Sequence, residues 1–204
     1  MRRLPLVILA VASCFVAGVS FAQEPHQDGP RPYEEVQSLS VPSGTPVVLS
    51  QADPRWAGLR LGRGTVQSHG CLFISVAMIA MELGLVSDPL TMMRSFVMNG
   101  LFESGGRLRT WSIERVFPGL RVLVRTAISA SGLDRIAEQL REGRHVLLKL
   151  DKNPRDSDIQ EHWVRVLRSE AGDLIIADSN GGLITSLQGR YGLGTIREML
   201  VLGN

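Results

Sequence analysis

The sequence has 204 residues, of which 44% are hydrophobic and 21% are charged, and its formal net charge is +2. This composition excludes a disordered chain, because enough apolar residues are present to build a core. It also argues against a nucleic-acid-binding protein, since the basic residues form no stripe with interleaved aromatic residues. We therefore expect a globular protein with no nucleic-acid partner.

The first 22 residues predict a secretory signal peptide. Two arginines precede an apolar stretch, and the small-residue pattern Ser20-Phe21-Ala22 predicts cleavage after Ala22. A retained membrane helix is the alternative, but the apolar stretch of roughly 18 residues is short for spanning and no basic cluster follows it. A lipidation box ending at Cys14 is a minor alternative. The protein is thus expected to be exported, periplasmic or secreted, with no other membrane association.

Removal of this leader changes the charge and the cysteine count. Arg2 and Arg3 leave with it and no acidic residue does, so the 22 basic residues become 20, against 20 acidic ones. Cys14 also leaves, which makes Cys71 the only cysteine. In an oxidising compartment a structural cysteine normally has a partner, so a lone one is either a small buried apolar residue or a reactive thiol. Composition alone favours the interpretation of Cys71 as a small buried apolar residue.

The remaining chain divides into a linker and one domain. Residues 23–44 are rich in proline, glycine and charge and lack apolar periodicity, which predicts a flexible linker. Residues 45–204, about 160 residues, are enough for one domain with a hydrophobic core.

Helices are expected first along this domain. Residues 71–83 are apolar on all sides and are followed by Gly84, which predicts a buried helix with a glycine C-cap. A second helix is expected to begin at Pro89 and to stop near Gly100. A short third helix is predicted over residues 111–117.

Extended segments are expected afterwards. Residues 120–126 alternate and predict a strand. In the helix predicted over 131–143, Ser131 stands three residues before Asp134, close to a capping box, and Gly143 is the expected stop.

Three strand-like segments follow, over residues 145–150, 162–169 and 173–179. The short link between the last two predicts an antiparallel hairpin. Helices first and strands afterwards predict an α+β domain, in which a helical half packs on an antiparallel sheet.

Cys71 opens the predicted buried helix. A thiol at this position faces the positive end of the helix dipole and several unpaired backbone N–H groups, which both favour the thiolate and therefore nucleophilic reactivity. Gly70 lets the backbone bend sharply or approach a substrate closely. A nucleophilic thiol needs a base, and the base needs an orienting group.

His162 and the end of the next strand supply a candidate base and orienter. In an antiparallel hairpin the start of one strand lies beside the end of the next. When residues are paired at equal distances from Ala171, the centre of the turn, His162 lies opposite residue 180. With a register shift of up to two residues allowed, either Asp178 or Asn180 can reach the imidazole. The alternative is that His162 and Asp178 only face solvent at the ends of their strands. A base and an orienting group on one hairpin, together with a cysteine at a helix start, favour a Cys-His-Asp triad instead.

Five segments carry a resemblance to a known family: SQADPRWAGLRLG, TVQSHGCLFISVAMIAMELG, PLTMMRSFVMNGLFESGGRLRTW, HWVRVL and IIADSNGG. Together they resemble the bacteriocin-processing, double-glycine leader cysteine peptidases, in a stand-alone form. That family is papain-like, so the resemblance, which spans about residues 48–182, implies a papain-like fold.

The resemblance also implies roles for individual residues. Cys71 would be the nucleophile, His162 the general base and Asp178 the group that orients the imidazole. Gln51 would donate to the oxyanion together with the backbone N–H of Cys71, as a side-chain amide and a helix-start N–H are suited to do. Ser179 stands where the family usually has proline, which leaves Asn180 open as the orienter.

Two alternatives remain within this site. Gln67, four residues before Cys71, competes with Gln51 as the oxyanion donor. His69, Cys71 and His162 would supply three zinc ligands, but no second ligand pair with metal spacing accompanies them. Residues 151–158 hold three aspartates without the spacing of a calcium loop and are expected to form a solvated loop. No cofactor or metal is expected.

The sequence therefore predicts an exported cysteine peptidase, a hydrolase of peptide amide bonds that acts on a peptide or protein through a thioester intermediate. An acyltransferase or amidase would use the same triad. A non-catalytic peptide- or cell-wall-binding module with an unreactive cysteine is the alternative from another class of function. No transporter domain accompanies the five segments, so the resemblance does not imply a leader peptide as the substrate.

Overall fold

The structure, a computed structural model, describes residues 45–153 and 160–203. These residues belong to one of the two units into which the chain divides, residues 34–204. The predicted signal peptide, 1–22, and the predicted linker, 23–44, lie outside the described residues, as do residues 154–158 of the loop predicted over 151–158. The start of that loop prediction is wrong, because Asp151 ends a strand and is buried.

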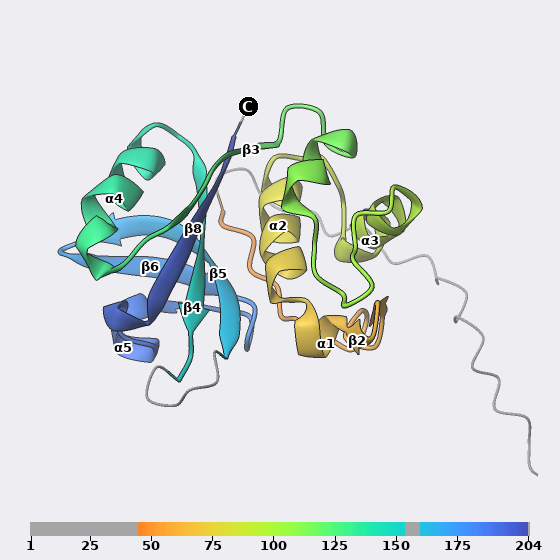
Figure 1. Cartoon of the computed structure of the whole chain (residues 1–204), viewed down its shortest axis with the longest axis horizontal. Helices are drawn as coiled ribbons and strands as arrows, with labels where there is room; N and C mark the ends of the chain where they lie inside the picture. Colours follow the sequence, from red (N-terminus) through yellow and green to blue (C-terminus); the bar gives the residue numbers. More distant parts are fainter. Residues whose placement is uncertain (1–44, 154–159, 204) are drawn as a thin grey trace, which may run out of the picture. The chain divides into compact units, whose positions relative to one another are not determined.

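The first half of the unit is helical. After a two-stranded ribbon, β1 (Arg60–Leu61) and β2 (Gly64–Thr65), come α1 (Val66–His69), α2 (Cys71–Glu82), α3 (Pro89–Met98) and the 3-10 helix η1 (Thr110–Arg115). Figure 1 shows α2 next to the sheet, with α3 on its far side.

Local signals fix both long helices of this half. The predicted end of α2 is confirmed: the N–H groups of Gly84 and Leu85 return to the carbonyls of Met81 and Ala80, with Gly84 in the left-handed region at φ 68°. The predicted start of α3 is also confirmed, with Pro89 in its first turn and Asp88 as the N-cap.

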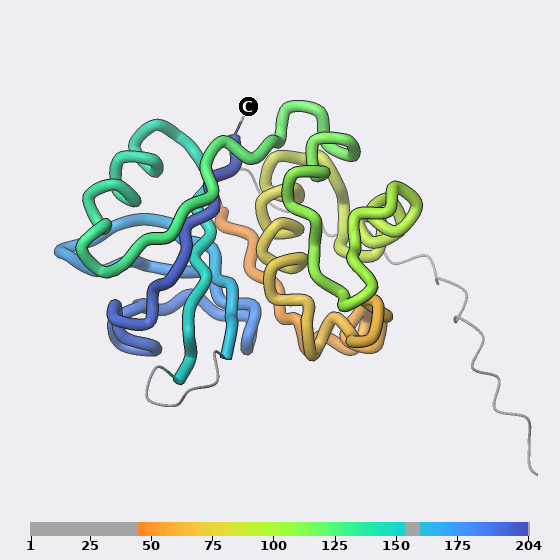
Figure 2. Tube along the Cα trace, in the orientation of Figure 1, coloured from red at the N-terminus to blue at the C-terminus, as the bar shows by residue number. Residues whose placement is uncertain are grey.

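A six-stranded sheet forms the second half. Its strands are β3 (Arg121–Ala127), β4 (His145–Asp151), β5 (Glu161–Glu170), β6 (Asp173–Asp178), β7 (Leu183–Ser186) and β8 (Ile196–Gly203). Their order across the sheet is β3-β8-β4-β5-β6-β7, and every neighbouring pair is antiparallel. The trace in Figure 2 shows how the C-terminal strand lies between two strands from earlier in the chain.

Short helices cover the outer face of this sheet. They are η2 (Ala130–Gly132), α4 (Leu133–Arg141), α5 (Leu187–Arg190) and η3 (Leu193–Thr195). The predicted capping interaction at the start of α4 is wrong: Gly132 is the N-cap, and the Ser131 hydroxyl bonds the hydroxyl of Ser129 instead. The preceding 3-10 turn places Gly132 at the N-cap position.

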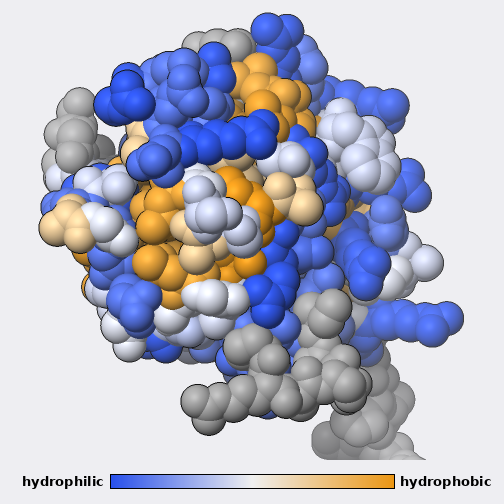
Figure 3. Space-filling model, turned by 60° about the vertical axis from the view of Figure 1, so that its left-hand side comes forward, coloured by the Kyte–Doolittle hydropathy of each residue, from blue (hydrophilic) through white to orange (hydrophobic). Residues whose placement is uncertain are grey.

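Strand alternation gives the sheet two apolar faces. On one face Leu147 and Trp163 join the cluster formed with α2 and α3, and on the other Val146 and Val164 join the cluster under α4. Figure 3 shows apolar residues gathered within hydrophilic surroundings on one side of the molecule. The result is an α+β unit with helices packed on an antiparallel sheet.

A partly buried ion pair links α2 to the sheet at the C-terminal end of that helix. Arg165 on β5 donates two hydrogen bonds to the Glu82 carboxylate, at 2.7 and 2.8 Å. Such a bidentate pair fixes orientation as well as distance. Because Cys71 lies at the other end of the same helix, the pair helps to hold the thiol in place relative to β5.

Candidate active site

Cys71 lies in the first turn of α2, half-buried and without a disulfide partner. The short helix α1 ends just before it, and its start is fixed by a capping box between Thr65 and Ser68. Gly70 joins the two helices. A Cβ at that position would come within 2.4 Å of the Val66 carbonyl oxygen, so the sharp junction requires glycine.

No side chain caps the start of α2. Its first N–H groups and the positive end of its dipole therefore remain available to a negative charge at Cys71 or at a bound group. The helix that begins at Cys71 is twelve residues long. The sequence folds here into an anion-stabilising helix start with a thiol in its first turn.

His162 and Asp178 meet at the predicted end of the hairpin. The imidazole Nε2 and the Asp178 carboxylate Oδ1 are 2.7 Å apart, and both side chains are buried. Asp178, and not Asn180, is the side chain that the imidazole meets. Asn180 instead donates its backbone N–H to the same carboxylate oxygen, at 2.8 Å.

A β-bulge explains why simple counting works for this hairpin. The two-residue turn pairs Glu170 with Asp173, but the register shifts between Val166 and Arg168, after which Arg165 pairs with Ala177. Extending that register sets His162 opposite Asn180, so Asp178 is its diagonal neighbour.

The pKa of His162 responds to Cys71 as well as to Asp178. Burial acts to lower the pKa of His162, but the hydrogen bonds with Asp178 and Cys71, and the charges of both groups, raise it from 6.5 to about 9. Because Asp178 occupies Nε2, Nδ1 is the ring nitrogen left for the sulfur. His162 is thus hydrogen-bonded to Asp178 at Nε2 and lies near enough to Cys71 for the thiol to act on its pKa.

Asp178 is ionised in this setting. Burial acts to raise its pKa, but hydrogen bonds from His162, the Tyr191 hydroxyl and the Asn180 N–H together hold the pKa below its usual 3.8. An ionised carboxylate next to a protonated imidazole stabilises the imidazolium. Above the acid range, the pair thus favours a positively charged His162.

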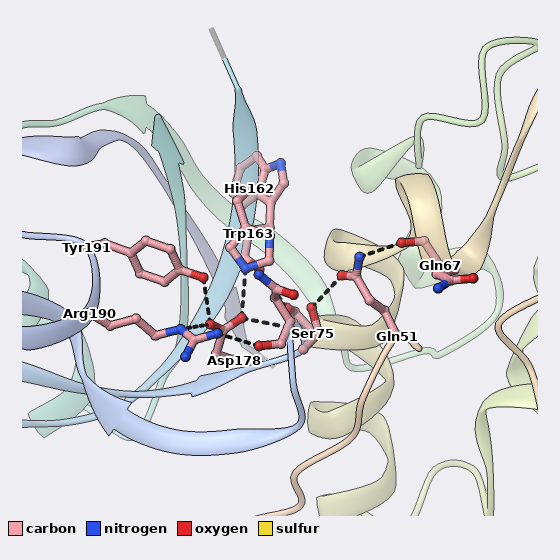
Figure 4. A network of polar contacts seen from close by, with 10 residues as sticks. Gln51, Gln67, Ser75, His162, Trp163, Asp178, Arg190 and Tyr191 are labelled. Carbon is pink, nitrogen blue, oxygen red and sulfur yellow. Dashed lines mark hydrogen bonds and ion pairs between the residues drawn. The ribbon is translucent and has the colours of Figure 1, made fainter. Parts of the chain in front are cut away.

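Gln51 lies next to the helix start with its amide held at both ends (Figure 4). Its Nε2 donates to the Gln67 carbonyl oxygen at 2.7 Å, and its Oε1 accepts from the Ser179 hydroxyl at 3.0 Å. The backbone N–H of Gln51 also donates to the Ser179 carbonyl, at 2.9 Å. One Nε2 hydrogen remains for a ligand after the bond to Gln67 is made.

Gln67, the competing glutamine, has an exposed side chain. It takes part in the site through its backbone carbonyl, which accepts from Gln51. The departure from the family pattern at Ser179 also acquires a structural role here. Proline at this position would have no hydroxyl to orient the Gln51 amide.

His69 lies apart from the Cys71, His162 and Asp178 contacts. Its Nδ1 is 2.7 Å from the Ser68 hydroxyl, and that hydroxyl also takes part in the α1 capping box with Thr65. In residues 45–153 and 160–203, no three His, Cys, Asp or Glu side chains are grouped to hold a metal ion. The same described segments contain no helix with the length and apolar character needed to cross a membrane.

A cleft of about 590 Å³ opens beside Cys71. One wall comes from the helical half and carries Leu72, Leu108 and Trp111, a tryptophan that is 65% exposed. The opposite wall comes from the sheet, where Arg125, Lys149 and Glu161 line the cleft. Glu198 pairs with both Arg125 and Lys149, so the charges on this wall form an alternating row across four strands.

Three residues of the site are not predicted from the sequence: Ser179, Arg190 and Tyr191. The Tyr191 hydroxyl donates to the Asp178 Oδ2 at 2.7 Å, and the Arg190 Nε lies 2.7 Å from the same oxygen. Arg190 and Tyr191 stand at the end of α5, and no spacing or composition signal in the sequence connects that short helix to β6. The chain matches no protein-family model, no curated protein and no solved structure, so the assignment of this site depends on its geometry.

Proposed function

We propose that this chain is an exported, papain-like cysteine peptidase that hydrolyses peptide amide bonds through Cys71, His162 and Asp178. One observation carries the proposal: a buried imidazole is hydrogen-bonded to a buried carboxylate, and the only described cysteine, at the start of α2, lies near enough to act on the pKa of that imidazole. A thiol near a base that is held by an orienting carboxylate is the arrangement that nucleophilic catalysis requires.

The first half of the reaction uses the imidazolium as an acid. The Cys71 sulfur attacks the carbonyl carbon of the peptide bond, and the carbonyl oxygen becomes an oxyanion. The Nδ1 proton of His162 then passes to the leaving amine as the C–N bond breaks, which leaves a thioester on Cys71 and a neutral imidazole.

The second half uses the imidazole as a base. A water molecule loses a proton to His162 and attacks the thioester carbonyl, and the C–S bond breaks to release the acid and restore the thiolate. Asp178 remains ionised throughout and supports the imidazolium whenever it forms. The net reaction consumes one amide and one water and gives one carboxylic acid and one amine.

The cleft beside Cys71 suits a peptide. Its apolar wall offers Trp111 and Leu108 to substrate side chains, and its charged wall offers donors and acceptors to polar groups. The helical wall also carries Glu103 and Arg107, so the cleft offers both apolar and charged side chains to a bound peptide.

The pH dependence of thiol alkylation tests the proposal against the non-catalytic binding module. With limiting iodoacetamide between pH 5 and 8, we expect Cys71 to react at a rate that persists well below the titration of a free thiol, at roughly 8.5. The reason is that the His162 imidazolium and the start of α2 stabilise the thiolate. A rate that falls with the ordinary thiol titration would favour the binding module.

The matched variant for this experiment is His162→Ala, in which the imidazolium is absent and alkylation should follow the ordinary titration more closely. A profile of cleaved peptides, measured with wild-type protein and with His162→Ala as the blank, then identifies the sequences that the cleft accepts. Cleavage that is equal in both proteins would place the activity elsewhere.

Gln51 is proposed as the oxyanion donor, together with the backbone N–H of Cys71. We expect Gln51→Ala to lower kcat by about 10²–10³, the usual cost of removing one oxyanion-hole donor, with a much smaller effect on KM. Ser179→Ala, which frees the amide to rotate, should lower kcat by only about 3–10-fold, since the donor itself remains. Steady-state kinetics on one peptide measures both effects.

Gln67→Ala is the matched control for Gln51→Ala. It removes an exposed side-chain amide of the same size and keeps the backbone carbonyl to which Gln51 donates. Its kcat should stay within about 2-fold of wild type, as for most exposed side chains outside a site. A large loss in Gln67→Ala with normal activity in Gln51→Ala would exchange the roles of the two glutamines.

A further inference from the structure

The Asp178 carboxylate is shared among more donors than the orientation of one imidazole requires. Oδ1 meets the His162 Nε2 and the Asn180 N–H, and Oδ2 meets the Tyr191 hydroxyl and the Arg190 Nε, at distances of 2.7 to 2.8 Å. Asp178 itself is fully buried. Figure 4 shows Tyr191 and Arg190 reaching this carboxylate from the side opposite Gln51.

We propose that Arg190 and Tyr191 are positioning residues that share the charge of Asp178 and thereby limit how strongly it holds the proton on His162. This inference rests on the proposed peptidase function. It assigns a role in the acid step to two residues that do not touch the substrate, and it names that role: keeping His162 a sufficiently strong acid to protonate the leaving amine.

The geometry of Arg190 supports a shared charge. Its Nε is directed at Asp178, and a terminal nitrogen donates to the Asn180 carbonyl at 2.6 Å, so the guanidinium is held by two partners. The Arg190 side chain is 30% exposed, and its charge is therefore only partly screened by water. A fixed positive charge beside a carboxylate competes with the imidazolium for that carboxylate.

The geometry of Tyr191 supports the same role through a neutral donor. Burial raises the pKa of Tyr191, so its hydroxyl stays protonated and donates to Asp178. Its ring also packs near His162, with the two ring centroids 5.8 Å apart. Among the described residues, Cys71 on α2 is the further titratable group that acts on His162.

The balance matters because the two half-reactions need opposite properties of His162. An imidazolium bound to an unshared buried carboxylate would keep its proton and fail to deliver it to an amine. A shared carboxylate orients the ring equally well but holds the proton less tightly. General acid catalysis is most efficient when the acid is neither fully committed to its proton nor already without it.

Removing the guanidinium should therefore make His162 a weaker acid. In Arg190→Gln we expect the pKa of His162 to rise above the wild-type value of about 9, by roughly 0.5–1 unit for a partly screened charge at this distance. Tyr191→Phe keeps the ring and loses only the hydroxyl, so the same shift should appear with a smaller size. Arg190→Lys restores the charge and should return the value toward wild type.

NMR titration of the His162 ring nitrogens in ¹⁵N-histidine-labelled protein measures this shift without any substrate. His162→Ala identifies the resonance among the four histidines of the chain. Arg168→Gln is the matched control, because it removes an arginine that is 52% exposed and pairs with Glu170 near the hairpin turn. That control should leave the His162 titration unchanged.

A comparison of substrates tests the consequence for catalysis. An amide needs a proton on its leaving amine, whereas an activated ester of the same acyl group does not. In Arg190→Gln, kcat for the amide should fall about 3–10-fold more than kcat for the ester, as expected of a weakened general acid.

The two readouts separate failure of this inference from failure of the proposed function. An unshifted or lowered His162 pKa in Arg190→Gln overturns the inference, whether or not the protein cleaves peptides. Equal losses for amide and ester overturn the catalytic part of it and leave Arg190 a structural residue. If the shift appears but wild-type protein shows no hydrolysis, the charge sharing stands and the peptidase proposal fails.

Discussion

Cys71→Ala is expected to remove peptide hydrolysis almost completely, by at least about 10³-fold in kcat, with the fold intact. Loss of the nucleophile ends covalent catalysis, and the residual rate then comes from binding and oxyanion stabilisation alone. The structural cost should be small, about 1 kcal/mol, because the side chain is half-buried and loses a single sulfur atom. Hydrolysis of the best substrate and thermal unfolding, measured on the same preparation, give both numbers.

Ser68→Ala is the control that tests the nearest competing nucleophile. Ser68 also lines the cleft, and its hydroxyl lies 2.7 Å from the His69 Nδ1, which resembles a serine–histidine dyad. That hydroxyl is committed to the backbone N–H of Thr65, at 2.9 Å, as part of the α1 cap. Ser68→Ala should therefore cost about 1 kcal/mol of stability and retain most activity. Full activity in Cys71→Ala, with none in Ser68→Ala, would move the nucleophile from Cys71 to Ser68.

Sequence signals that act over one helical turn predict the helical half well. Gly84 and Pro89 mark an end and a start because their backbone preferences are intrinsic to those residue types. Ser131 shows the limit of such signals. Its spacing from Asp134 is close to a capping box, but the chain enters α4 through a 3-10 turn that makes Gly132 the N-cap.

Non-local pairing is where prediction from the sequence fails. Strand β8 pairs with β3 and β4, and its partners at Thr126 and Leu148 precede Met199 by dozens of residues. The sequence of β8 contains no turn signal that links it to either strand. The contact between Tyr191 and Asp178 is missed for the same reason, because it depends on how β7 and α5 return across the sheet.

The pairing of His162 with the end of β6 can be predicted from the sequence because a hairpin is a local structure. Counting back from the turn limited the partner of His162 to Asp178 or Asn180, and the structure places the imidazole on Asp178. The position of Gln51 came instead from the family resemblance. Its contacts with Gln67 and Ser179 join segments that are 16 and 128 residues apart, which no pattern within either segment specifies.

Asp178→Ala is expected to remove a pH-dependent part of the stability. The folded-state pKa of His162, about 9, lies above the ordinary value of 6.5, so the folded protein binds a proton more tightly than the unfolded chain. That contribution is fully present below pH 6.5 and is lost as the pH rises through 9. The contribution to the unfolding free energy is about 3 kcal/mol for a buried imidazole, because each pH unit between 6.5 and 9 corresponds to about 1.4 kcal/mol.

Without the carboxylate, burial and the nearby Arg190 both act against the imidazolium, so the folded-state pKa of His162 should fall toward or below 6.5. Urea unfolding at pH 6, 7, 8 and 9 then distinguishes the two proteins. The difference in unfolding free energy between wild type and Asp178→Ala should shrink as the pH rises from 6.5 to 9. A difference that stays constant over this range would mean that His162 and Asp178 are not coupled as an ion pair. The imidazolium would then have no buried counter-ion, and the acid step assigned to His162 would lose its physical basis.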